Sequence, residues 1–158
     1  MQLASRAELP PVGFGNPVAL RVAFLMSLAV MLTTMIPIVN VFSPLWWLGA
    51  GLCAVLLYRR LTGMSLSVRA GARLGSITGV LAFVSVVVII AITVALSGSE
   101  LFQEVRRQNP NAYQVLNNTP ALVFAVSLAL LFFFAMIVGI CAAGGALGAR
   151  FASRNAKV

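Results

Sequence analysis

Residues Leu74 to Ser99 read LGSITGVLAFVSVVVIIAITVALSGS, without a single Asp, Glu, Lys or Arg. A helix crosses a lipid bilayer with about 20 consecutive apolar residues, and this stretch exceeds that length. Two other uncharged stretches, Val22–Tyr58 and Gln108–Ala149, are longer still. The sequence therefore predicts an all-α protein that is embedded in a membrane.

The chain as a whole is also strongly apolar: 61% of its 158 residues are hydrophobic and only 9% are charged. Four crossings use most of the length, so we expect one membrane domain, residues 1–158, folded as an antiparallel bundle of four transmembrane helices. The predicted spans are residues 20–39, 44–59, 70–97 and 121–148. Residues 98–120 form the longest predicted loop, and Leu101, Phe102 and Val105 within it have the spacing of a short helix on the outer membrane surface.

Basic residues predict the orientation of the bundle. The N-terminal part up to residue 21, the part from 59 to 73 and the part after the fourth span hold nine of the 11 Lys and Arg residues. The segment between the third and fourth spans holds only Arg106 and Arg107, beside Glu100 and Glu104. Cytoplasmic loops are enriched in Lys and Arg, so both termini are expected in the cytoplasm. This asymmetry explains the net charge of +8, and no nucleic-acid partner is predicted.

The arginines at the cytoplasmic ends of spans two to four are the predicted contacts for anionic lipid headgroups, which attract basic segments at the membrane surface. These residues are Arg59, Arg60, Arg69, Arg73, Arg150 and Arg154.

Small residues repeat every four positions in the third and fourth spans, and such repeats form grooves that let helices approach closely in lipid. The predicted packing residues are Gly71, Gly75 and Gly79 in the third span, and Gly139, Gly144 and Gly148 in the fourth. Both series lie in the cytoplasmic half of the bilayer, so we expect the two grooves to face each other and the bundle to widen toward the outside. Packing within one chain, contact between copies of the chain, and a glycine-lined passage are three uses that fit this pattern.

Three segments resemble small glycine-rich, four-span bacterial membrane proteins of unknown function. They are Tyr58–Gly63, Gly71–Gly79 and Gly144–Arg150. The resemblance implies a four-helix inner-membrane protein, and it transfers no active-site residue to this chain.

Side chains for catalysis are scarce, since the chain has no histidine and its three acids, Glu8, Glu100 and Glu104, all lie outside the predicted spans. Cys53 and Cys141 lie within spans and are interpreted as buried thiols that bind no metal. We therefore predict no enzyme, cofactor or metal. Serine and threonine within spans are expected to bond to their own helix or across a helix contact.

The predicted function is a non-enzymatic structural, oligomerising or partner-binding module of the membrane. Its expected partners are membrane lipids, a second copy of the chain or another membrane protein. The alternative is a small pore or carrier for a neutral solute, which needs no ionisable residue within the membrane.

Overall fold

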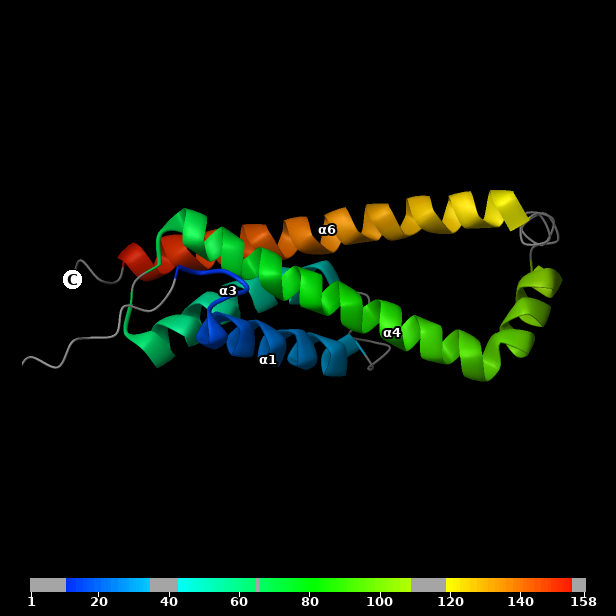
Figure 1. The fold of residues 1–158 in the computed structure, drawn as a ribbon, viewed down its shortest axis with the longest axis horizontal. Helices are drawn as coiled ribbons and strands as arrows, with labels where there is room; N and C mark the ends of the chain where they lie inside the picture. The colour runs from blue at the N-terminus through cyan, green and yellow to red at the C-terminus, as the bar shows by residue number, and fades with distance from the viewer. Residues whose placement is uncertain (1–10, 35–42, 65, 109–118, 155–158) are drawn as a thin grey trace, which may run out of the picture.

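A computed structural model describes residues 11–34, 43–64, 66–108 and 119–154. This part of the chain consists of four helices: α1 (Pro17–Thr34), α3 (Ser43–Thr62), α4 (Val68–Gln108) and α6 (Thr119–Arg154). They form two antiparallel hairpins, α1–α3 and α4–α6, which lie side by side (Figure 1). The prediction of an all-α fold is confirmed.

Two of these helices are long and apolar enough to cross a membrane. The stretches that qualify are Val68–Gly98 in α4 and Thr119–Ala152 in α6. The first predicted span coincides with the shorter α1 as far as Thr34, and its remainder lies outside the described residues. The second lies within α3, which extends beyond it at both ends.

α4 changes direction where the third span was predicted to end. Ser97 has φ −126° and ψ 15°, so the helical backbone is interrupted there and resumes as far as Gln108 (Figure 1). A short helix was predicted in this region, and residues 98–108 are helical. The apolar face predicted for it, and the loop residues 109–118, lie outside what the structure describes.

Local signals in the sequence begin and end these helices. The side-chain oxygen of Asn16 accepts hydrogen bonds from the backbone N–H groups of Val18 and Ala19, which caps α1 while Pro17 occupies its first position. α3 ends at Thr62 and is followed by Gly63, whose φ of +67° suits glycine and whose N–H donates to the carbonyl oxygen of Arg59.

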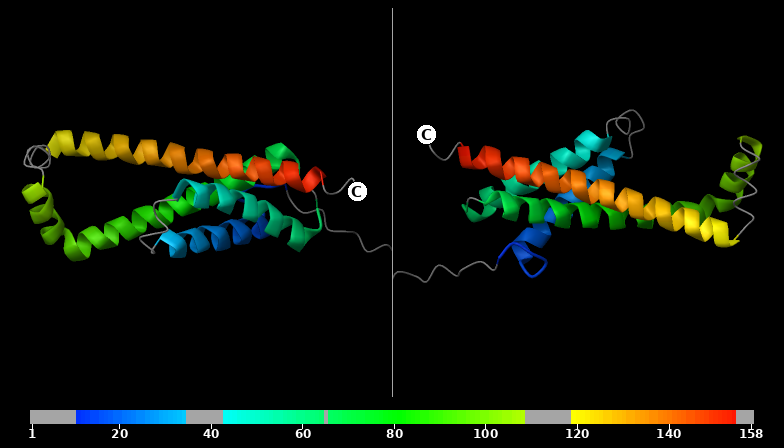
Figure 2. Two further views of the ribbon diagram at one scale, coloured as in Figure 1. Left: turned by 180° about the vertical axis from the view of Figure 1, so that it is seen from behind. Right: turned by 90° about the horizontal axis from the view of Figure 1, so that it is seen from above.

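The α1–α3 hairpin covers only one half of the α4–α6 hairpin, the half that contains the C-terminal end of α6 (Figures 1 and 2). Two clusters of buried side chains fill the space between the hairpins. One comprises Ala19, Val22, Ala54, Val55, Tyr58, Leu74 and Ala149. The other comprises Val30, Trp47, Ala50, Ala82, Ile137 and Cys141. Beyond the second cluster, α4 and α6 diverge and are covered by no other described helix (Figure 2).

Candidate functional site: a small-residue helix contact beside an arginine-rich end

Glycines of α4 bring its backbone against the backbone of α6. A Cβ atom added to Gly75 would clash with the carbonyl oxygen of Cys141 and would lie 3.1 Å from Cα of Ala142. Cβ atoms added to Gly71 and Gly79 would lie 2.7 Å and 2.8 Å from carbon atoms of α6. Ordinary contacts of a Cβ atom are 3.4–4 Å long. At these three predicted positions, any larger residue would therefore force the two helices apart.

Two adjacent glycines of α6 face two different helices. A Cβ atom added to Gly145 would clash with the carbonyl oxygen of Gly71, so Gly145 faces α4. Gly144 and Gly148 face α3 instead, because a Cβ atom on Gly148 would lie 3.1 Å from Cα of Leu52 and one on Gly144 would clash with an α3 carbonyl. Our expectation that the groove of Gly144 and Gly148 meets α4 is wrong. Successive helix residues point about 100° apart, so Gly144 and Gly145 serve different neighbours.

Two further glycines differ from the prediction. Gly51 of α3 was not among the predicted packing residues, yet a Cβ atom there would lie 2.9 Å from the backbone nitrogen of Gly145. Gly139 was predicted to pack, but an added Cβ atom at this position would meet no atom within 4 Å. The glycines therefore bring both α3 and α4 into close contact with α6, and Gly139 lies outside this contact.

Large aromatic side chains mark the level at which α4 and α6 separate. The rings of Phe83 and Phe134 meet edge to face, with 5.2 Å between their centroids. Farther along, Leu96 on α4 is 82% exposed and Phe124 on α6 is 71% exposed. Small residues at one end and phenylalanines at the other thus explain why the hairpin opens away from the arginine-rich end (Figure 1).

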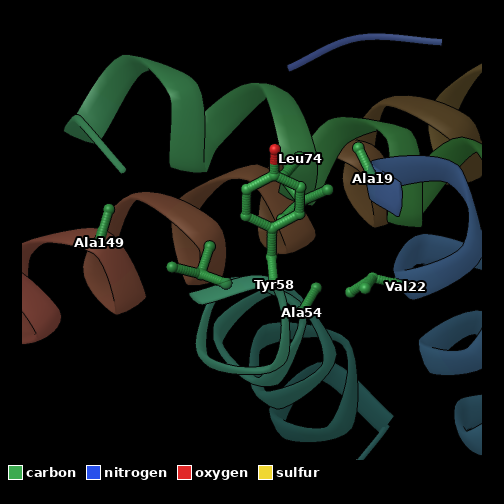
Figure 3. Packing of buried hydrophobic residues seen from close by; sticks show 7 residues of the cluster. Ala19, Val22, Ala54, Tyr58, Leu74 and Ala149 are labelled. Carbon is green, nitrogen blue, oxygen red and sulfur yellow. The ribbon is translucent and has the colours of Figure 1, made fainter. Parts of the chain in front are cut away.

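A buried polar contact joins α1 to α3 near the arginine-rich end. Tyr58 is only 2% exposed, and its ring points from α3 toward α4 among small apolar side chains (Figure 3). Its hydroxyl oxygen accepts a hydrogen bond of 3.1 Å from Nδ2 of Asn16, which is fully buried. Asn16 was not among the predicted site residues, although Asn followed by Pro is a recognisable helix start.

The basic ends of three helices gather at this end of the bundle (Figure 1). The side chains of Arg60, Arg69, Arg73 and Arg150 are exposed there. The guanidinium of Arg59 is partly buried, and its Nη1 donates a 2.8 Å hydrogen bond to the carbonyl oxygen of Ala152 in the last turn of α6. Arg154 ends α6 at the same place, and its side chain lies outside the described part of the molecule.

Polar side chains of α4 are occupied within the helix, as expected. The hydroxyls of Ser76, Thr78, Ser85 and Thr93 each donate to a carbonyl one turn earlier. Within the described ranges, three or more potential metal ligands do not gather at any point.

The two thiols differ from each other. Cys141 is buried, as predicted, and its sulfur donates to the carbonyl oxygen of Trp47 over 3.2 Å. Cys53 is exposed, contrary to the prediction, because it points out of the bundle from α3. Nε1 of Trp47 is buried without a hydrogen-bond partner.

Grooves open on the outer surface of the bundle. One of about 530 Å³ is lined by Met26, Cys53, Leu56, Leu57, Arg59 and Arg60. A second, of about 200 Å³, is lined by Met26, Ala29, Val30, Thr33, Trp46, Gly49, Ala50 and Cys53. A third, of about 340 Å³, lies between the N-terminal segment and α4 and includes Arg73.

No protein-family model matches this chain, and neither a curated protein nor a solved structure matches it.

Proposed function

We propose that this chain is a four-span protein of the bacterial inner membrane, with both termini in the cytoplasm, and that it serves as a non-enzymatic structural or partner-binding module. The alternative function is a small pore or carrier for a neutral solute.

The observation that carries the membrane assignment is the exposure of the two most apolar helices. Only 11% of the most apolar part of α4 and 6% of that of α6 is buried within the chain. The core helix of a soluble protein would be mostly buried, because exposed apolar patches larger than a few hundred Å² are costly in water. Lipid or another membrane protein is the environment that suits such surfaces.

Helix lengths and charges support the proposed topology. At about 1.5 Å per residue, α1 and α3 are about 27 Å and 30 Å long, which matches a hydrocarbon layer of about 30 Å. The apolar parts of α4 and α6 are about 45–50 Å long, so these helices must tilt or extend beyond the layer. Arginines gather at one end of the bundle, whereas Glu100 and Glu104 lie toward the other end of α4. The positive-inside rule then favours the arginine-rich end as the cytoplasmic one.

The interior of the bundle favours a structural module over a pore. Backbones of α3, α4 and α6 are in direct contact at the glycines, and the hydroxyls of Ser76 and Thr78 are bonded within α4 rather than presented to a passage. The three grooves described above lie on the outer surface. In contrast, the diverging halves of α4 and α6 offer an apolar surface for a second copy or another membrane protein.

Disulfide cross-linking in native membranes tests this role. In a chain without its native cysteines, Leu131→Cys places a thiol on the uncovered half of α6, where Leu131 is 65% exposed. Leu32→Cys is the matched control, because Leu32 is 61% exposed on α1. We expect oxidation to trap a dimer or a heteromeric complex through residue 131 and not through residue 32.

Flux of glycerol or urea into liposomes tests the alternative. If the protein is a structural module, liposomes that contain it should be no more permeable to these solutes than protein-free liposomes. Specific solute flux together with no complex at residue 131 would contradict the module and favour the pore.

A further inference from the structure

We infer that the outer surface of the α1–α3 hairpin holds one anionic phospholipid, with its phosphate at Arg59 and Arg60 and an acyl chain along the groove between the two helices. The inference deepens the proposed partnership with anionic lipids, and it rests on the proposed placement of the arginine-rich end at the cytoplasmic leaflet.

The shape of the surface supports a chain-like ligand. The two grooves between α1 and α3 share Met26 and Cys53, so they adjoin each other. Together they extend along α3 from Arg60 to Trp46, a distance of about 21 Å at about 1.5 Å per residue. One leaflet of the hydrocarbon layer is about 15 Å thick, so the combined groove is long enough for an acyl chain.

The lining changes from charged to apolar along this length. Arg59 and Arg60 line only the end near the cytoplasmic side. Leu56, Leu57 and Met26 follow, and the far part is lined mainly by small or apolar residues. Gly49 lies in this far part, and an added Cβ atom there would meet nothing within 4 Å, as expected in an open groove. A phospholipid has the same order of chemistry, a phosphate followed by hydrocarbon.

Arg59 is held in position for a phosphate. One of its N–H groups donates to the carbonyl of Ala152, which fixes the guanidinium at the edge of the groove. A guanidinium has five N–H donors, so others remain for phosphate oxygens, which arginine binds in a bidentate manner. Carboxylates do not line this groove in the described part of the chain, so a phosphate would meet no repulsion from its walls. The third groove contains one arginine and lacks such an apolar extension.

Native mass spectrometry of the full-length protein in detergent tests the site, with equal amounts of phosphatidylglycerol and phosphatidylcholine added. We expect one phosphatidylglycerol to be retained per chain in preference to phosphatidylcholine. Arg60→Gln should weaken this retention about fivefold, since one cation near an anionic lipid contributes about 1 kcal/mol. Arg21→Gln is the matched control, because it removes the same charge from an exposed position at the same end but outside the groove, and Arg21 is not one of the predicted lipid contacts.

A second variant separates the groove from its charge. Cys53→Phe fills the region that the two grooves share without changing any charge, and the exposed position requires no rearrangement of the core. Val84→Phe is its control, because Val84 is 51% exposed on α4 away from the groove. We expect Cys53→Phe to abolish preferential retention and Val84→Phe to leave it unchanged, with the thermal stability of both variants close to that of the wild type.

Three results would overturn the inference. Arg21→Gln could weaken retention as much as Arg60→Gln, which would indicate general attraction of anionic lipid to the basic end. Millimolar inorganic phosphate could displace the bound lipid, which would indicate that the protein recognises only the phosphate and not the acyl chain. Cys53→Phe could dissociate a dimer, which would assign the groove to a second copy of the chain. Failure of the lipid site would leave the proposed topology intact, because topology is measured separately by cysteine labelling.

Discussion

Replacing Gly75 with alanine adds one carbon atom at the point where α4 and α6 are in backbone contact. The new Cβ atom would clash with the carbonyl oxygen of Cys141 and would lie 2.9 Å from the carbonyl carbon of that residue. These are backbone atoms, so the contact is relieved only if the two helices separate by about 1 Å. A gap of this size forfeits up to about half of the dispersion energy of the atom pairs that it separates. We expect a loss of about 1–3 kcal/mol in the free energy of unfolding, the usual cost of overpacking.

Gly139→Ala is the matched control for this substitution. It makes the same chemical change in the middle of α6, where the added atom would meet nothing within 4 Å. Alanine favours a helix over glycine by about 1 kcal/mol, so this variant should be neutral or slightly more stable than the wild type. Denaturation with sodium dodecyl sulfate in mixed micelles, followed by tryptophan fluorescence, measures both variants. Equal unfolding free energies for Gly75→Ala and Gly139→Ala would refute the assignment of Gly75 to the helix contact.

Other predictions concern the buried polar groups and use the same denaturation assay. Tyr58→Phe removes the acceptor for Nδ2 of Asn16 and should cost about 1–2 kcal/mol, whereas Asn16→Ala should cost about 1 kcal/mol more because the cap of α1 is also lost. A smaller effect for Asn16→Ala than for Tyr58→Phe would contradict this role. Trp47→Phe removes a buried N–H group that has no hydrogen-bond partner, so the variant no longer has the desolvation cost of that group. This saving offsets part of the packing energy that the smaller ring loses. We therefore expect Trp47→Phe to be less destabilised than Tyr58→Phe.

The helices could be predicted from the sequence because long apolar stretches and their flanking charges are properties of the local chain. Even the break at Ser97 coincides with the end of the third predicted span. The positions of Gly71, Gly75 and Gly79 on one face of α4 also follow from helix periodicity, and the structure places that face against α6.

The partner of each glycine could not be predicted in the same way. The spacing of Gly144 and Gly148 defines a face of α6, but it does not say which neighbouring helix lies there, and that neighbour is α3. The contact between Asn16 and Tyr58 joins residues that are 42 positions apart, and it depends on the packing of α1 against α3. The same packing leaves Cys53 on the outer surface, a feature of tertiary structure that the composition of the span does not reveal.

Cysteine accessibility in intact cells tests the proposed topology most directly. The experiment uses a chain without Cys53 and Cys141 that carries one new cysteine at a time. A cysteine at Leu45 lies in the first turn of α3, one at Met64 lies between α3 and α4, and one at Glu104 lies beyond the break in α4. A membrane-impermeant maleimide should label residues 45 and 104 in intact cells and residue 64 only after the membrane is opened. Labelling of residue 64 in intact cells would contradict the orientation. Protection of residue 45 in intact cells while residue 104 is labelled would contradict four spans.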